Sequence, residues 1–305
     1  MDIESLVRHI RKVAGESEDS QPSTLYHYTT IEVLDKLLEE GNGDLRCTYF
    51  RDLNDSAEFK AGYEYFADYC KRHDFGGDGE KVLRDLQGIW HKLQTLYLEA
   101  PWVMSFSTER DSLYQWVAYT DRQKGGVAIG FDRIRLENAV KKSAERNGLE
   151  VMLLPCLYVD RGKKKKTDSD VAVIDKLDDL ISFFIEKIDE KSPDWVQELG
   201  TAILIFSSIV KDKAFCAEHE WRLVVITRDR LSCKDAEVIA GKARLPLGLR
   251  EAGKRKVGEL VSEIQRSPHG DQKRLMHSIL FPKCSDANLT YKIAYSDLPY
   301  KGEKT

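Results

Sequence analysis

A chain of 305 residues, 42% of them hydrophobic, is long enough to bury one large core or two smaller ones. Its net charge of −4 gives no general attraction to nucleic acid, which leaves only local basic patches for such contacts. No window reaches the roughly 18 consecutive apolar residues of a membrane span, and the N-terminus lacks the pattern of a signal peptide. The six cysteines lack the spacing of a zinc site, so we expect free thiols in a soluble, cytoplasmic protein.

The chain divides into a short N-terminal segment and a longer domain. Apolar residues at helical spacing between Met1 and Val13 predict an amphipathic helix, and the polar stretch 15–23 predicts a linker. We therefore expect residues 1–22 to form a helix and linker, and residues 23–305 to form a single α+β domain. Two apolar helices, predicted over 171–188 and 195–210, form a helical insertion near 171–210 in that domain.

The run 25–30 is a short β-prone stretch that contains His27 and leads directly into a helix. Thr29 and Glu32 have the spacing of a capping box, and apolar residues follow at helical period. A second strand is predicted over 45–49. The sequence thus predicts a strand with a histidine, a helix and a second strand in close succession.

Helix and strand patterns alternate through the middle of the chain. Helices are predicted over 56–71, 80–99 and 113–119, and strands over 102–106, 127–131 and 151–159. Around the first of these strands, Ser105 and Ser107 flank Phe106, so both hydroxyls are expected to point away from the apolar layer. Ser107 is therefore a candidate for lining a cleft.

The helix predicted over 113–119 presents different residues on different sides. Gln115 and Tyr119 lie four positions apart and share one face, whereas Trp116 turns elsewhere. We expect one face of this helix to pack in the core and another to line a cleft.

A strongly apolar strand predicted over 221–227 places Glu220 at the end of a sheet. Arg222 lies two residues further on and shares the face of Glu220 in a strand. Two roles stay open for this arginine: it pairs with a pyrophosphate, or it neutralises the glutamate. Shorter elements are predicted over 257–264, 272–280 and 289–294.

Two other patterns point to different chemistry. Asp52, Asp55 and Glu58 cluster closely enough to suggest a metal site, but acidic residues also cap helices, and one begins near Ser56. We favour the cap. The basic stretch 161–166 is typical of a solvated loop and, less often, of a nucleic-acid contact.

Several motifs together resemble a bacterial family described as domain of unknown function 2971, which is found among phage-defence and abortive-infection genes. The motifs are 25–29, Asn54-Asp55 with Glu58-Phe59, Ser105-Phe106-Ser107, Gln115-Trp116, 125–131, 220–223 and 296–300. They span nearly the whole chain. The resemblance implies a role in antiviral defence, as an effector or toxin that poisons a host or viral target.

The opening strand, histidine and helix also resemble ADP-ribosyltransferases of the diphtheria-toxin type. This resemblance implies an α+β fold, an ADP-ribosyltransferase-like split mixed sheet with helical insertions, that binds NAD. Cleavage of the nicotinamide–ribose bond develops positive charge on the ribose, which a fixed carboxylate stabilises. By position, His27 is expected to hold the adenosine-side ribose, and Glu220 to stabilise the cation and orient the acceptor. The other residues implied to bind NAD are Tyr28, Thr29, Ser107, Gln115, Trp116, Tyr119 and Arg222.

The resemblance therefore predicts an NAD-consuming enzyme, either an ADP-ribosyltransferase or an NAD glycohydrolase. The expected partners are NAD, a protein or nucleic-acid acceptor, and a regulator such as an antitoxin; no metal and no membrane are expected. One alternative is a non-catalytic module that senses a nucleotide or a phage protein on a degenerate transferase fold, because the pair of tyrosines that cradles nicotinamide is missing. The other alternative is a metal-dependent nuclease that uses Asp52, Asp55 and Glu58 with the loop 161–166.

Overall fold

The computed structural model describes most of the chain: residues 2–17, 20–38, 44–53, 56–73, 84, 87–88, 101–121, 123–160, 168–188, 195–227, 235–249, 257–270 and 292–298. The described helices are α1 (Ile3–Val13), α2 (Ile31–Leu38), α3 (Ser56–Arg72), α5 (Leu113–Tyr119), α6 (Arg133–Asn147), α7 (Asp168–Glu186), α8 (Trp195–Ile209) and α9 (Val257–Leu260). Two 3-10 helices, η1 (Phe50–Asp52) and η2 (Lys213–Glu218), accompany them.

The described strands are distributed along the whole chain. They are β1 (Thr24–Thr30), β2 (Asp44–Tyr49), β3 (Pro101–Ser107), β4 (Gly126–Asp132), β5 (Leu149–Pro155), β6 (Leu157–Val159), β7 (Val210–Asp212), β8 (Glu220–Thr227), β9 (Glu237–Ile239), β10 (Lys242–Gly248), β11 (Val261–Arg266) and β12 (Lys292–Tyr295). Ten of these described strands form one sheet, and β6 pairs with β7 in a separate two-stranded sheet. The large sheet is mixed, because β11 and β12 are parallel while the other pairs are antiparallel. The expected α+β class with a mixed sheet is confirmed.

Strand β3 is the junction of the large sheet. One edge of β3 pairs with β8, which continues to β5. The other edge is shared: Ser107 at the end of β3 lies opposite Tyr26 of β1, and Val103 near its start lies opposite Thr48 of β2. From there β1 leads to β4, β11 and β12, whereas β2 leads to β10 and β9. The sheet is therefore split between β1 and β2, and no described strand pairs with the middle of β3 on this edge.

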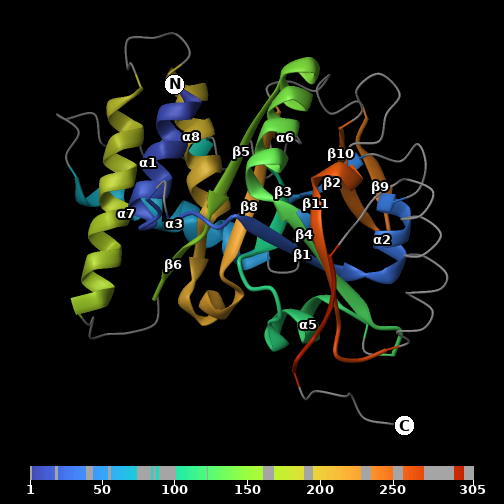
Figure 1. The fold of residues 1–305 in the computed structure, drawn as a ribbon. Helices are drawn as coiled ribbons and strands as arrows, with labels where there is room; N and C mark the ends of the chain where they lie inside the picture. The colour runs from blue at the N-terminus through green and yellow to red at the C-terminus, as the bar shows by residue number, and fades with distance from the viewer. Residues whose placement is uncertain are drawn as a thin grey trace.

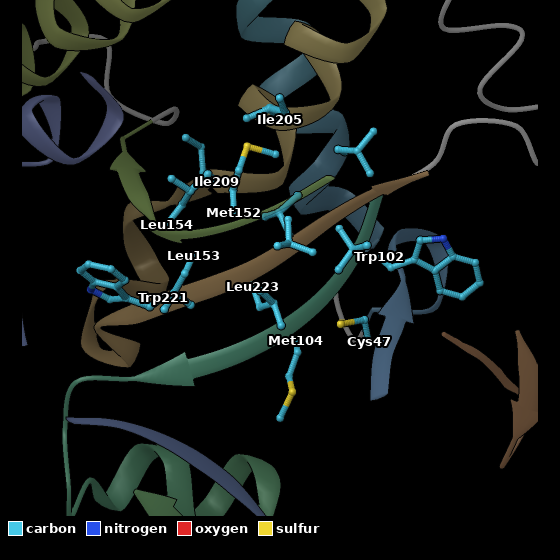
Figure 2. Packing of buried hydrophobic residues seen from close by; sticks show 14 of the residues in the cluster. Cys47, Trp102, Met104, Met152, Leu153, Leu154, Ile205, Ile209, Trp221 and Leu223 are labelled. Atoms are coloured by element: carbon cyan, nitrogen blue, oxygen red, sulfur yellow. The ribbon is translucent and has the colours of Figure 1, made fainter. Parts of the chain in front are cut away.

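Helices α1, α3, α7 and α8 form a layer beside β5, β8 and β3 (Figure 1). Figure 2 shows Ile205 and Ile209 of α8 packing near Met152 of β5. All eight residues of β8 are buried, as expected for a strand with a continuous apolar run that is covered on both faces. The predicted helical insertion thus supplies a large part of the hydrophobic core.

The N-terminal helix belongs to the same core. Leu6 and Ile10 of α1 are fully buried within the hydrophobic cluster that holds the sheet and α8 together. Asp2 caps the helix by accepting a hydrogen bond from the amide of Glu4 at 3.1 Å. The helix packs on β5 and α7, so it is part of the helical layer beside the sheet.

Several local expectations need correction. Helix α2 begins at Ile31, and Thr29 lies inside β1 opposite Val127, so Thr29 is one position too early to be the helix N-cap. The strand expected over 151–159 is divided into β5 and β6 at Cys156. The helices expected over 80–99 and 272–280 fall mostly or entirely outside the described residues.

The elements that have no counterpart in the expectations include α6, β9 and β10. Helix α6 is highly charged and buries only a short stripe, which weakens its periodic signal. Its ends nevertheless carry standard signals, because Asp132 caps the first turn and Gly148 ends the helix with a φ of 64°. Strand β10 contains Pro246, which disfavours a strand assignment from sequence.

Gly62 marks the closest approach of α3 to α8. A Cβ added at Gly62 would lie 2.5 Å from the Cα of Ser207, which is far inside van der Waals contact. We expect Gly62→Ala to push the two helices apart and to lower the free energy of unfolding by about 1–3 kcal/mol, measured by urea denaturation. Lys60→Ala, at an exposed position of the same helix, is the control and should change stability little. Equal stability of Gly62→Ala and the parent would contradict this close packing.

Candidate functional site

A cleft of about 760 Å³ lies over the split in the sheet. Its walls come from β1, β2, β3, α5, η2, β8 and β10, so it brings together segments that are far apart in the sequence. It contains both residues expected to be catalytic, His27 and Glu220. The other expected site residues that line it are Tyr28, Thr29, Ser107, Gln115, Tyr119 and Arg222.

His27 fills the split between β1 and β2. Its Nδ1 lies 2.9 Å from the carbonyl oxygen of Ser105 on β3. Because a carbonyl only accepts, Nδ1 carries the hydrogen and Nε2 of the neutral ring is left as an acceptor. Burial lowers the pKa of His27, the bond to Ser105 opposes this shift, and the charge of Arg244 adds to it. The ring is therefore neutral at pH 7, and no described residue hydrogen-bonds its Nε2.

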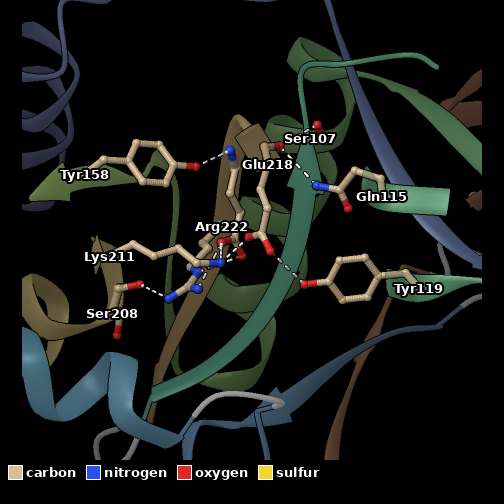
Figure 3. Close-up of polar contacts among 9 residues, drawn as sticks. Ser107, Gln115, Tyr119, Tyr158, Ser208, Lys211, Glu218 and Arg222 are labelled. Atoms are coloured by element: carbon tan, nitrogen blue, oxygen red, sulfur yellow. Dashed lines mark hydrogen bonds and ion pairs between the residues drawn. The ribbon is translucent and has the colours of Figure 1, made fainter. Parts of the chain in front are cut away.

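Glu220 belongs to a buried network of four charged side chains; the other three, Lys211, Glu218 and Arg222, are labelled in Figure 3. Lys211 Nζ lies 2.7 Å from one Glu220 carboxylate oxygen, and it also pairs with Glu218. Arg222 donates from Nε and Nη2 to the two oxygens of Glu220 at 2.8 and 3.0 Å. The two negative carboxylates are matched by two positive side chains, so the network has no net formal charge. Buried charges are paired in this way because an unpaired buried charge is costly.

The cations set the ionisation of Glu220. Burial alone would raise the pKa of this carboxyl, but the neighbouring Arg222 and Lys211 outweigh burial and lower the pKa of Glu220 to about 2. Glu220 is therefore a carboxylate at any physiological pH. Of the two roles left open for Arg222, the structure shows neutralisation of Glu220; its third nitrogen, Nη1, donates to the carbonyl of Ser208 at 2.8 Å.

Residues of β3 and α5 hold the segment that precedes Glu220. Ser107 Oγ and Gln115 Nε2 both donate to the carbonyl oxygen of Glu218, at 2.7 and 3.1 Å. The Tyr119 hydroxyl donates to the Glu218 carboxylate at 3.3 Å (Figure 3). Gln115 and Tyr119 share the cleft face of α5, as their spacing predicts. These contacts fix the Glu218 side of the cleft.

Trp116 lies apart from the cleft, contrary to its implied NAD-binding role. Its ring is fully buried against Tyr28, with ring centroids 4.6 Å apart, and its Nε1 donates to Asp111 at 2.7 Å. Helical geometry explains the difference, because a residue adjacent to Gln115 faces another side of α5. Tyr28 lines the cleft, but its hydroxyl donates to the carbonyl of Glu109 at 2.7 Å.

Several charged residues of the cleft were missed from the sequence, among them Lys211, Glu218 and Arg244. Lys211 carries a usable signal, because it is the first cation after the apolar helix α8. Glu218 is separated from Glu220 only by His219, whose φ of 44° turns the chain between them. Arg244 lies on β10, a strand that was not expected.

The possible metal site of Asp52, Asp55 and Glu58 is only partly described. Among the described residues, no group of three or more histidine, cysteine, aspartate or glutamate side chains is placed to hold one. In the alternative metal site, the side chains of Asp55 and Glu58 lie outside the described part of the chain. Asp52 accepts a hydrogen bond from the amide of Ala243 at 2.7 Å and so anchors β10.

Four cysteines are described, and none of them is in a disulfide. Cys47, Cys70 and Cys156 are buried, whereas Cys216 is exposed. Burial raises the pKa of Cys47 to about 12, which keeps that thiol protonated and unreactive. No described helix has the length and apolar character needed to cross a membrane.

Comparison with protein families gives one match. A family model described as "Protein of unknown function (DUF2971)" matches residues 115–223, which run from α5 to β8 and include Glu218, Glu220 and Arg222. This match supports the family resemblance over that segment. Searches of curated proteins and of solved structures find no significant match.

Lys211 tests the charge network directly. Lys211→Met leaves two buried carboxylates with one cation, so we expect it to lower the free energy of unfolding by about 3–5 kcal/mol in urea denaturation. Adding Glu218→Gln restores the charge balance and should recover part of that loss. The exposed Lys213→Met is the control. A Lys211→Met variant as stable as the control would contradict the network.

The depressed pKa of Glu220 also predicts a pH dependence. Its pKa is about 2 in the folded protein against an ordinary value of 4.5, so its contribution to stability is complete above pH 4.5 and is lost as pH falls toward 2. We expect the difference in unfolding free energy between the parent and Glu220→Gln to shrink as pH falls from 5.5 to 3.5, measured by urea denaturation. A difference that stays constant or grows over this range would contradict the depressed pKa.

Proposed function

We propose that the protein is an NAD-consuming enzyme that transfers ADP-ribose to a macromolecule or hydrolyses NAD. One observation carries the proposal: His27 and Glu220, almost two hundred positions apart, line one cleft of about 760 Å³ over a split sheet. That volume lies within the range of small-molecule and cofactor sites. The neutral imidazole offers an acceptor for a ribose hydroxyl, and the carboxylate offers a fixed negative charge.

The chemistry proposed for this cleft is cleavage of the bond between nicotinamide and ribose C1′. The bond breaks with both electrons leaving on nicotinamide, which departs as a neutral molecule and leaves positive charge on the ribose. The ionised Glu220 stabilises that charge, and an acceptor hydroxyl, amine or water then bonds to C1′ and releases its proton to solvent. With a pKa of about 2, Glu220 is a poor proton acceptor, so its role is electrostatic.

A second candidate is a non-catalytic module that binds a nucleotide or a phage protein in the same cleft. It is favoured by the ion pairs of Glu220, because Arg222 and Lys211 occupy both carboxylate oxygens and reduce the net field at the cleft. Transition-state stabilisation requires that this field still favours a cation at C1′. Binding without turnover has no such requirement.

The family resemblance extends the proposal to a biological role. We propose that the NAD-consuming activity serves antiviral defence, with a protein or nucleic acid as acceptor and a regulator such as an antitoxin restraining it. The family match over residues 115–223 supports the resemblance and contains one of the two residues proposed as catalytic, Glu220.

Glu220→Gln separates catalysis from binding. If the carboxylate stabilises the ribose cation, the variant should lose at least about a hundredfold in nicotinamide release from NAD, with NAD affinity changed little, measured by chromatography and by calorimetry. The matched control is Glu137→Gln, which removes a carboxylate held by Arg11 and Arg133 far from the cleft. Activity of the parent should survive a chelator.

Two results would overturn the proposed activity. Unchanged nicotinamide release by Glu220→Gln would exclude an electrostatic role for this carboxylate. A parent protein that binds NAD but leaves it intact would favour the non-catalytic module instead.

A further inference from the structure

A second charged region of the cleft lies on β2 and β10, outside the network of Glu220. These strands are antiparallel, with Arg244 directly opposite Thr48. Side chains of a strand alternate between its two faces, and the inner face of this pair is buried in the core by Leu45, Cys47, Leu245 and Leu247. Arg46, Thr48, Lys242 and Arg244 consequently lie on the face that lines the cleft.

Arg244 differs from the other arginines of the cleft. Arg222 is paired with Glu220, and Arg46 is paired with Glu237 at 2.8 Å. The guanidinium of Arg244 donates to the hydroxyl of Thr48, and no carboxylate in the described part of the chain lies within ion-pair distance of it. Asp52 attracts Arg244 from further away. The half-buried Arg244 therefore has donors available for an anion.

The position of Arg244 relates it to the two residues of the proposed chemistry. Along β3, Val103 lies opposite Thr48, Ser105 accepts from His27, and Ser107 lies opposite Glu220. Four residue steps along a strand span roughly 13 Å. The regions of the cleft beside Thr48 and beside Glu220 are therefore separated by more than the length of one ribose. The charge of Arg244 also acts on His27, which places the two groups within electrostatic reach.

We propose that Arg244, together with Thr48, binds a phosphate or diphosphate group of the ligand that occupies the cleft. A planar guanidinium matches the geometry of phosphate oxygens and forms charge-assisted pairs with them. The proposal rests on the proposed function for the identity of the ligand as a dinucleotide. It assigns the diphosphate to the β2–β10 side of His27, away from Glu220. The ribose held by His27 then lies between the diphosphate and Glu220, so it is the ribose attached to nicotinamide and not the adenosine-side ribose that the resemblance implies.

Binding measurements test this assignment without requiring turnover. Calorimetry with ADP, adenosine and inorganic pyrophosphate should show that the parent protein binds ADP more tightly than adenosine. Arg244→Gln should weaken ADP binding at least about tenfold and leave adenosine binding unchanged, whereas Arg244→Lys should retain part of the ADP affinity. The matched control is Arg46→Gln, on the same face but already paired with Glu237, and it should change ADP affinity less than threefold. Circular dichroism establishes that each variant is folded.

The outcomes separate this assignment from the proposed activity. Loss of ADP affinity in Arg244→Gln supports the phosphate site even if NAD is never cleaved. Equal affinities of the parent for ADP and adenosine, no ADP binding, or equal losses in the Arg244 and Arg46 variants would overturn it. If pyrophosphate binds and its binding depends on Arg244, the site recognises the diphosphate alone. If pyrophosphate does not bind but ADP binding depends on Arg244, the site recognises the diphosphate only when the nucleoside is attached.

Discussion

The buried pairing of Lys211 and Arg222 with Glu218 and Glu220 is the interaction on which the candidate site depends. Carboxylates are rarely buried unless they are paired, because loss of hydration costs several kcal/mol. Here two cations from different segments, strand β7 and strand β8, hold two glutamates at the edge of a cleft. The pairing keeps Glu220 ionised and fixes the turn that carries Glu218. It also reduces the net negative field of Glu220 in the cleft, the field on which the proposed cleavage of NAD depends.

The split sheet provides the space for this network. Because β1 and β2 pair with different ends of β3, the middle of β3 has no partner among the described strands on that edge. The His27 imidazole satisfies the carbonyl of Ser105 at this point, which a backbone ladder would otherwise satisfy. A side chain thus makes the hydrogen bond that a neighbouring strand would otherwise make, and the gap between β1 and β2 forms part of the cleft. The layer of α1, α3, α7 and α8 stabilises the opposite side of β8 and β3.

Sequence patterns predicted the elements that are governed by local periodicity. The strand with His27, the helix 113–119 and the apolar strand after Glu220 all agree with the structure, because each has a clear apolar pattern. Helix α6 and strands β9 and β10 were missed, since their stability comes from packing on distant strands and their own patterns are weak. Lys211 and Arg244 were missed for the same reason. Their importance arises from partners that lie far away in the sequence.

We propose that this cleft cleaves NAD at the nicotinamide–ribose bond. The most direct measurement is mass spectrometry of the purified protein incubated with NAD, alone and with cell extract. We expect free nicotinamide, accompanied either by ADP-ribose or by an acceptor that carries an added ADP-ribosyl group. Intact NAD under every condition, with the protein folded, would contradict it.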